Sequence, residues 1–111
     1  MIYVTDTQRN AIYDRALGAY GEQNQCMVLM EECSELIQAV SKVLRYGNTP
    51  ETLDHMAEEI ADVSIMLEQA IRFLNIPPVR IAEWKCRKLE RLSARIDNDS
   101  KKPLDKSPKI V

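Results

Sequence analysis

A four-residue break, Gly47-Asn48-Thr49-Pro50, separates the two longest helical patterns of the chain. Glycine commonly ends a helix, and threonine followed by proline is typical of the start of the next one. The pattern before the break runs from about Glu22 to Tyr46, and the pattern after it ends before Asn75-Ile76-Pro77-Pro78. Two long helices joined by so short a turn are expected to fold back on each other as an antiparallel hairpin.

Apolar residues recur at helical spacing on both segments. The stripe before the break consists of Leu29, Cys33, Leu36, Ile37, Val40 and Leu44. The stripe after it consists of Leu53, Met56, Ile60, Val63, Leu67, Ile71 and Leu74. We take these stripes as the apolar faces of the two helices, and we expect Cys33 to be a small core residue.

Shorter helices flank the hairpin on both sides. Thr5 or Asp6 can cap a first helix that runs to about Tyr20, where Gly21 breaks the pattern. A last helix is expected over about residues 78–96, with an apolar face of Ala82, Cys86, Leu89, Leu92 and Ile96. The predicted fold is therefore all-α with four helices. One domain spans residues 1–96, and the polar, proline-containing residues 97–111 form a disordered, flexible tail.

Composition indicates which partners and which cellular compartment to expect for the chain. The 111 residues fit one domain, and the net charge of −2 gives no reason to expect a nucleic acid polymer as partner. Three cysteines without a CxxC spacing suggest reduced thiols in a cytoplasmic protein. The sequence shows no signal-peptide pattern at its start and no apolar run of about 18 residues, so we expect no membrane association.

Acidic clusters lie on both sides of the break at equal distances. Glu35 and Glu59 are each 12 residues from Gly47, and Glu32 and Asp62 are each 15 residues from it. Within each cluster the two residues are three apart, so they share one side of a helix. In an antiparallel hairpin the two pairs reach the same height, where they either face each other or both face away.

If the pairs face each other, four carboxylates converge and repel one another unless something neutralises them. A divalent cation does so, and ligands that are all oxygen favour Mg²⁺, Mn²⁺ or Ca²⁺ over zinc. The other interpretation is a pair of solvated acidic faces. The matched spacing favours the metal site, while Glu31 and Glu58 are expected either to support the ligands or to be simply exposed.

The only histidine, His55, is expected at the surface or near a helix cap. A ferritin-like di-iron site needs a glutamate three residues before a histidine, and Thr52 occupies that position. Asn24 and Gln25, at the start of the second helix, are weak candidates for nucleotide contacts.

The paired motif EECSE and EIAD, with 23 residues between Glu35 and Glu59, resembles the EExxE…ExxD signature of the MazG-like all-α NTP pyrophosphatases. The likeness covers about residues 20–96 and implies a Mg²⁺-dependent enzyme, with Mn²⁺ as the alternative ion. It matches Glu32, Glu35, Glu59 and Asp62 to metal ligands and Glu31 to a motif position of less certain role. It also implies a homodimer or homotetramer whose partner helices help to close the substrate pocket.

A stripe on the last helix consists of Trp84, Lys88, Arg91 and Arg95, and KLERLSARI resembles the final helix of several MazG-like proteins. Lys88 and Arg91 are candidates for binding phosphates. Trp84 and Arg95 are weaker candidates for contacting the nucleotide. The alternatives are a solvated face, or a subunit contact that buries Trp84.

The resemblance implies hydrolysis of a (d)NTP between the α- and β-phosphates, and Glu35 is the candidate to orient or deprotonate the attacking water. Two other functions stay open. One is a non-enzymatic scaffold or nucleotide sensor on the same fold, and the other is a phosphoribosyl-ATP pyrophosphohydrolase. Base and sugar specificity do not follow from the sequence.

Overall fold

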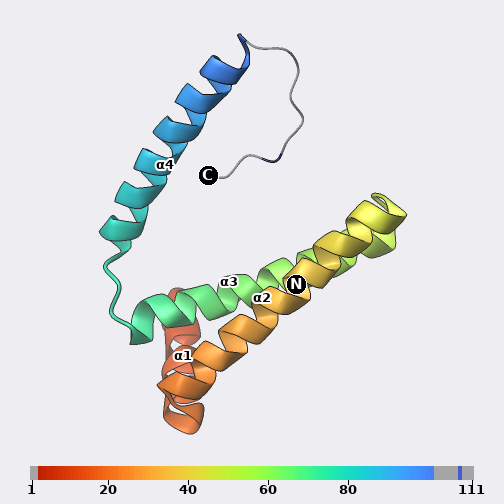
Figure 1. Ribbon diagram of the computed structural model, residues 1–111. Coiled ribbons are helices and arrows are strands. Elements are labelled where there is room, and N and C mark those ends of the chain that lie inside the picture. Colours follow the sequence, from red (N-terminus) through yellow and green to blue (C-terminus); the bar gives the residue numbers. More distant parts are fainter. Residues whose placement is uncertain (1–2, 102–107, 109–111) are drawn as a thin grey trace. The chain divides into compact units, whose positions relative to one another are not determined.

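The computed structural model describes residues 3–101 and residue 108. Within these residues the chain forms α-helices and no strand, which confirms the predicted all-α class (Figure 1). In chain order the helices are α1 (Asp6–Tyr20), α2 (Glu22–Tyr46), α3 (Pro50–Phe73) and α4 (Pro78–Asp99). The chain divides into two compact units, Met1–Asn75 with α1 to α3 and Ile76–Val111 with α4. The packing of four helices as one bundle, and a single domain over residues 1–96, stay predictions.

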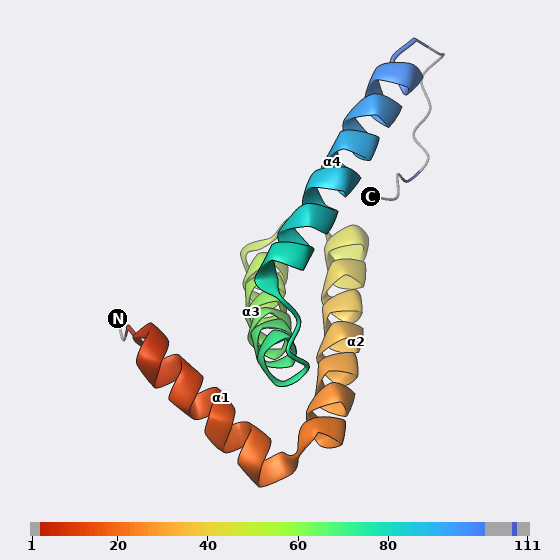
Figure 2. The same cartoon turned by 90° about the vertical axis from the view of Figure 1, so that its left-hand side faces the viewer.

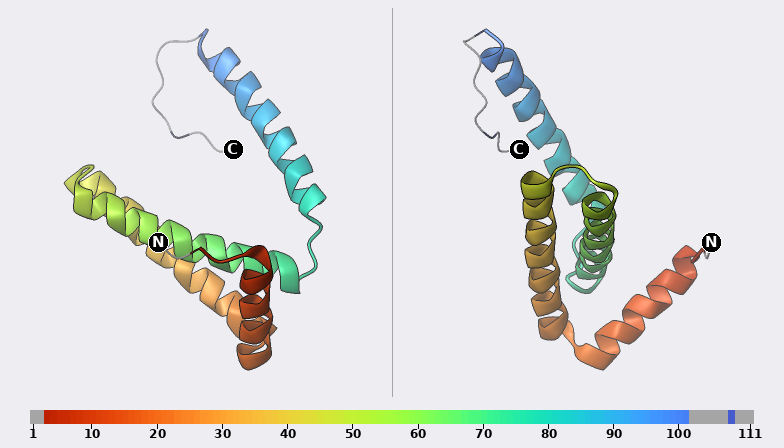
Figure 3. Two further views of the ribbon diagram at one scale, coloured as in Figure 1. Left: turned by 180° about the vertical axis from the view of Figure 1, so that it is seen from behind. Right: turned by 90° about the vertical axis from the view of Figure 1, so that its right-hand side faces the viewer.

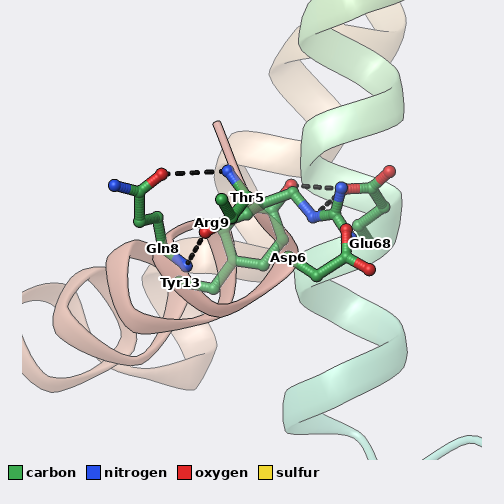
Figure 4. Close-up of polar contacts among 6 residues, drawn as sticks. All are labelled: Thr5, Asp6, Gln8, Arg9, Tyr13 and Glu68. Atoms are coloured by element: carbon green, nitrogen blue, oxygen red, sulfur yellow. Dashed lines mark hydrogen bonds and ion pairs between the residues drawn. The ribbon is translucent and has the colours of Figure 1, made fainter. Parts of the chain in front are cut away.

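The helix ends follow local capping chemistry. The hydroxyl oxygen of Thr5 accepts a hydrogen bond from the Gln8 amide at 3.1 Å, and the Gln8 side chain accepts one from the Thr5 amide at 2.9 Å (Figure 4). Thr49 and Thr52 form the same reciprocal pair at the start of α3. Gly21 and Gly47 adopt φ values of 82° and 85°, which favour glycine, and each ends the helix before it.

The last helix is three residues longer than the sequence analysis predicted. Asp97, Asn98 and Asp99 continue α4 beyond Ile96, because no glycine or proline interrupts the chain there. The Ser100 hydroxyl donates to the Asp97 carbonyl at 2.8 Å and helps to close the helix end. The predicted flexible tail therefore begins inside a helix, and its residues 102–107 and 109–111 lie outside the described part of the chain.

Helices α2 and α3 form the predicted antiparallel hairpin and lie side by side along their length (Figure 2; Figure 3, right). The buried apolar residues of this pair are Ala39 on α2 and Val63, Met66 and Ala70 on α3. Alanines on both helices allow their backbones to come close. No helix in the described part of the chain is long and apolar enough to cross a membrane.

The face that α3 buries differs from its predicted apolar stripe. Only Val63 of that stripe is buried, while Leu53, Ile60, Leu67 and Leu74 remain 44–49 % exposed. On α2, Ile37 and Leu44 are 70 % and 84 % exposed. At 100° per residue, the buried faces are turned by roughly 70–90° from the stripes, toward the acidic pairs. Acidic residues therefore lie within the contact between the helices, and several large apolar side chains, such as Ile37 and Leu44, lie outside it.

Polar contacts fasten α1 to the second half of α3. The buried Tyr13 hydroxyl donates a hydrogen bond to Glu68, which also pairs with Arg9 at 3.5 Å (Figure 4). Arg72 and Asp14 form a second ion pair at 2.7 Å. Burial, together with the Glu68 carboxylate, raises the pKa of Tyr13 to about 12, so its hydroxyl stays a donor at neutral pH.

Candidate metal centre

Four carboxylates meet inside the hairpin. Glu32 and Glu35 come from α2, and Glu59 and Asp62 come from α3. One oxygen of each residue lies within 4.8 Å of an oxygen of every other. The equal spacing around Gly47 places the pairs at the same height, and the turned helix faces point them toward each other. The predicted convergence is therefore confirmed, while the role of these residues as metal ligands stays a prediction.

Two of these carboxylates hold oxygens that are buried without a partner. Glu59 is only 6 % exposed, and its Oε2 atom accepts no hydrogen bond. The Oε2 atom of Glu32 is likewise buried and accepts no hydrogen bond. An unsatisfied buried acceptor typically costs about 1–3 kcal/mol, and more when it is charged. The folded chain therefore gains from any positive charge or proton that reaches this point.

The pKa values of both residues are raised accordingly. Burial, followed by the charges of Glu35 and Asp62, raises the pKa of Glu32 from 4.5 to about 7. The same causes, in the same order, raise the pKa of Glu59. Near neutral pH the cluster can hold a proton, or it can hold a cation in place of that proton.

The donor set fits a hard divalent cation. All of the converging donors are carboxylate oxygens, which suit Mg²⁺ and Mn²⁺ better than softer metals. The two unpartnered oxygens come one from each helix, so a cation between the helices would satisfy both. Nothing about the cluster requires a thiol, and Cys33 is half-buried on α2 as a free cysteine.

The two neighbouring glutamates differ in exposure from the four clustered carboxylates. Glu31 and Glu58 are both exposed. Glu58, however, forms a second group with Glu59 and the half-buried His55, in which one ligand atom from each lies within 4.8 Å of the others. From the sequence His55 is expected at the surface or near a helix cap, whereas the structure shows it half-buried beside two carboxylates. The signal lies after the histidine, where carboxylates follow at three and four residues.

The candidates at the start of α2 make structural contacts. The buried Gln25 amide donates to Gln69 of α3 at 2.9 Å, and Asn24 donates to the Tyr20 carbonyl at 2.8 Å. Both residues nevertheless border a hollow of about 800 Å³. Its lining consists of Tyr20, Asn24, Gln25, Met27, Val28, Met30 and Glu31. The hollow reaches Glu31, the neighbour of Glu32 in the chain.

The candidates on α4 belong to the second unit. Trp84 is 47 % exposed, and the Arg87 guanidinium lies over its ring at 5.1 Å, a contact that the sequence analysis missed. Trp84 and Lys88 line a shallow groove of about 410 Å³ with Ile81, Lys85 and Leu89. Arg91 is exposed and Arg95 is half-buried. Contacts of Trp84, Lys88, Arg91 and Arg95 with phosphate or nucleotide stay predictions.

Comparisons of the chain with protein-family models, curated proteins and solved structures find no match. By its fold and its candidate site, the chain is an all-α protein with a four-carboxylate cluster inside a helical hairpin. Its function has to follow from the chemistry of these residues.

Proposed function

We propose that this protein is a Mg²⁺-dependent nucleoside triphosphate pyrophosphohydrolase that cleaves (d)NTPs to a nucleoside monophosphate and pyrophosphate. The observation that carries the proposal is the pair of buried, unpartnered oxygens of Glu32 and Glu59 within a group of four carboxylates. Such a group is costly to fold unless a cation neutralises it. A Mg²⁺ ion held by carboxylates commonly keeps positions for water and substrate phosphates.

Glu32, Glu35, Glu59 and Asp62 would hold the ion, and Mn²⁺ could replace Mg²⁺. When bound, Mg²⁺ neutralises charge on the phosphate oxygens and stabilises the charge that develops during hydrolysis. Glu35 is the candidate for the residue that orients or deprotonates the attacking water. Its half-buried side chain belongs to the cluster, yet neither of its oxygens is among the buried atoms without a partner. It is therefore within reach of a water at the edge of the site.

The substrate class is supported by the resemblance of EECSE and EIAD to the MazG-like signature and by two further features. The hollow of about 800 Å³ beside Glu31 is large enough for a nucleoside. Lys88 and Arg91 of α4 supply positive charge suited to a polyphosphate, and Trp84 offers a ring for stacking. Arg95, on the same helix, is a further proposed nucleotide contact.

Assembly into a homodimer or homotetramer is part of the proposal. Much of the apolar stripes of α2 and α3 stays exposed in the single chain, with Ile37 and Leu44 as the extreme cases, although Val63 is buried. Covering them with a second copy would remove this apolar surface from water. We place the enzyme in the cytoplasm, where Mg²⁺ and nucleotides are available and cysteines stay reduced.

Two other functions remain candidates on the same residues. A phosphoribosyl-ATP pyrophosphohydrolase would use the same metal centre on a different substrate. A nucleotide sensor or scaffold would keep the fold without turnover. The four carboxylates argue against a scaffold, because they cost stability that a purely structural protein has no reason to give up.

The test is pyrophosphate release from a panel of NTPs, dNTPs and phosphoribosyl-ATP with Mg²⁺, measured for the wild type and for Glu35→Gln. Glu35→Gln keeps the shape and removes the charge, so activity should fall by about 10²- to 10⁴-fold while helix content is retained. Glu51→Gln is the matched control, because Glu51 is an exposed glutamate of the first turn of α3. A folded Glu35→Gln variant with wild-type turnover would remove Glu35 from the mechanism.

A further inference from the structure

His55, Glu58 and Glu59 lie on one side of α3, at positions i, i+3 and i+4. One ring nitrogen of His55 and one oxygen of each glutamate lie within 4.8 Å of one another. Opposite ligands of a small divalent ion are at most about 4.4 Å apart, given metal–ligand distances near 2.0–2.2 Å. Small side-chain movements would therefore bring all three atoms onto one ion.

The three groups approach one another without bonding to one another. Within the described part of the chain, no ion pair or hydrogen bond engages the His55 ring. Its nitrogen therefore remains available as a ligand.

Glu59 connects this group to the four-carboxylate cluster. It is 94 % buried, since 6 % is exposed, and it supplies a ligand atom to both groups. Its Oε2 atom has no hydrogen-bond partner. A carboxylate has two oxygens with about four lone-pair directions, so one side chain can bind two cations at once. Glu59 belongs to both groups, so it is the residue through which two bound ions would be joined.

We propose that His55, Glu58 and Glu59 form a second divalent-cation site, joined to the four-carboxylate centre through Glu59. The ligand chemistry of this second site differs from that of the first. One imidazole and two carboxylates suit Mn²⁺, Fe²⁺ or Zn²⁺, whereas the all-carboxylate cluster suits Mg²⁺. The half-buried His55 and the exposed Glu58 leave the second site open toward solvent.

The site is tested by counting bound ions with Mn²⁺, which fits both ligand sets. Equilibrium dialysis followed by elemental analysis should give two Mn²⁺ per wild-type chain. Electron paramagnetic resonance should show the two ions magnetically coupled, as expected for a shared carboxylate. His55→Ala should bind one Mn²⁺ per chain and lose the coupled signal.

Two further variants serve as a second test of the ligands and as a control. Glu58→Gln changes an exposed side chain, so it should fold normally and also retain one ion. Asp54→Asn, next to His55 but in neither group, should keep two. One ion in the wild type, or two in His55→Ala, would overturn the second site and leave the first intact. No bound ion in any variant would overturn both sites.

Discussion

Glu32 and Glu59 place carboxylate oxygens inside the hairpin, and each has an oxygen without a hydrogen-bond partner. Most buried polar atoms in proteins are satisfied, so two such oxygens from different helices in one cluster require an explanation. The proposed cation site explains both oxygens. On the proposed function, the protein would lose stability at these residues and recover it when a cation binds there.

The raised pKa of Glu32 predicts how stability depends on pH. In the unfolded chain Glu32 has its ordinary pKa of 4.5, and in the folded chain its pKa is about 7. The folded state therefore holds the proton more tightly, and this contribution is complete below pH 4.5 and lost as pH rises through 7. Without divalent cations, the melting temperature should fall between pH 5 and pH 8 for this reason.

Adding Mg²⁺ should reverse that loss, because the cation binds the deprotonated carboxylates. Thermal melts followed by circular dichroism, with EDTA or Mg²⁺ at pH 5 and pH 8, measure both effects. Mg²⁺ should raise the melting temperature more at pH 8. Glu32→Gln mimics the protonated side chain and should flatten the dependence. If Mg²⁺ leaves the melting temperature at pH 8 unchanged, no cation binds at Glu32.

The ends of the helices were largely predictable from local capping residues. Gly21, Gly47 and the Thr49-Pro50 pair fix the ends of α1, α2 and α3 within the chain itself. Only the end of α4 was misplaced, because Asp97 and Asn98 look like loop residues yet are followed by no immediate stop. The register of the carboxylates was also predictable, since Gly47 lies midway between them.

The buried face of each helix was not predictable from apolar spacing. Periodicity shows which side of a helix avoids water, but it does not show which neighbour covers that side. In this chain small residues such as Ala39 and Ala70 bring α2 and α3 together, while Ile37 and Leu44 stay outside. The grouping of His55 with Glu58 and Glu59 is likewise not evident from apolar spacing. Its significance depends on Glu59, whose burial the sequence does not reveal.

The stripe of α4 gives a prediction for a single element. If Arg91 binds phosphate in a partly desolvated site, Arg91→Ala should cost about 1.5–3 kcal/mol, a ten- to hundredfold drop in kcat/KM. Mg²⁺ binding should persist. Arg80→Ala is the control, because Arg80 forms an exposed pair with Glu83 that is worth less than about 1 kcal/mol.

The outcomes for Arg91→Ala separate the interpretations of this stripe. Lower kcat/KM with unchanged assembly supports phosphate binding. A shift in the subunit equilibrium on size-exclusion chromatography would indicate an interface instead. If kinetics and assembly both stay unchanged, the stripe is a solvated face.

At the scale of the whole molecule, exposed apolar surface predicts assembly. Stable interfaces usually bury more than about 1,000 Å², and the exposed apolar residues of α2 and α3 offer a candidate surface. Light scattering at micromolar concentration should give a dimer or a larger species. Ile37→Glu should dissociate it, whereas Ile12→Glu on α1, a residue that is 52 % exposed, should not. A monomeric wild type would contradict the predicted assembly.

We propose that the carboxylate cluster uses Mg²⁺ to cleave a nucleotide between its α- and β-phosphates. Phosphorus NMR of nucleoside triphosphates incubated with the protein tests it most directly, because the products reveal which bond breaks. With Mg²⁺ we expect signals of a nucleoside monophosphate and pyrophosphate, and with EDTA an unchanged triphosphate. A triphosphate that persists in the presence of Mg²⁺, or release of inorganic phosphate and a diphosphate, would contradict the claim.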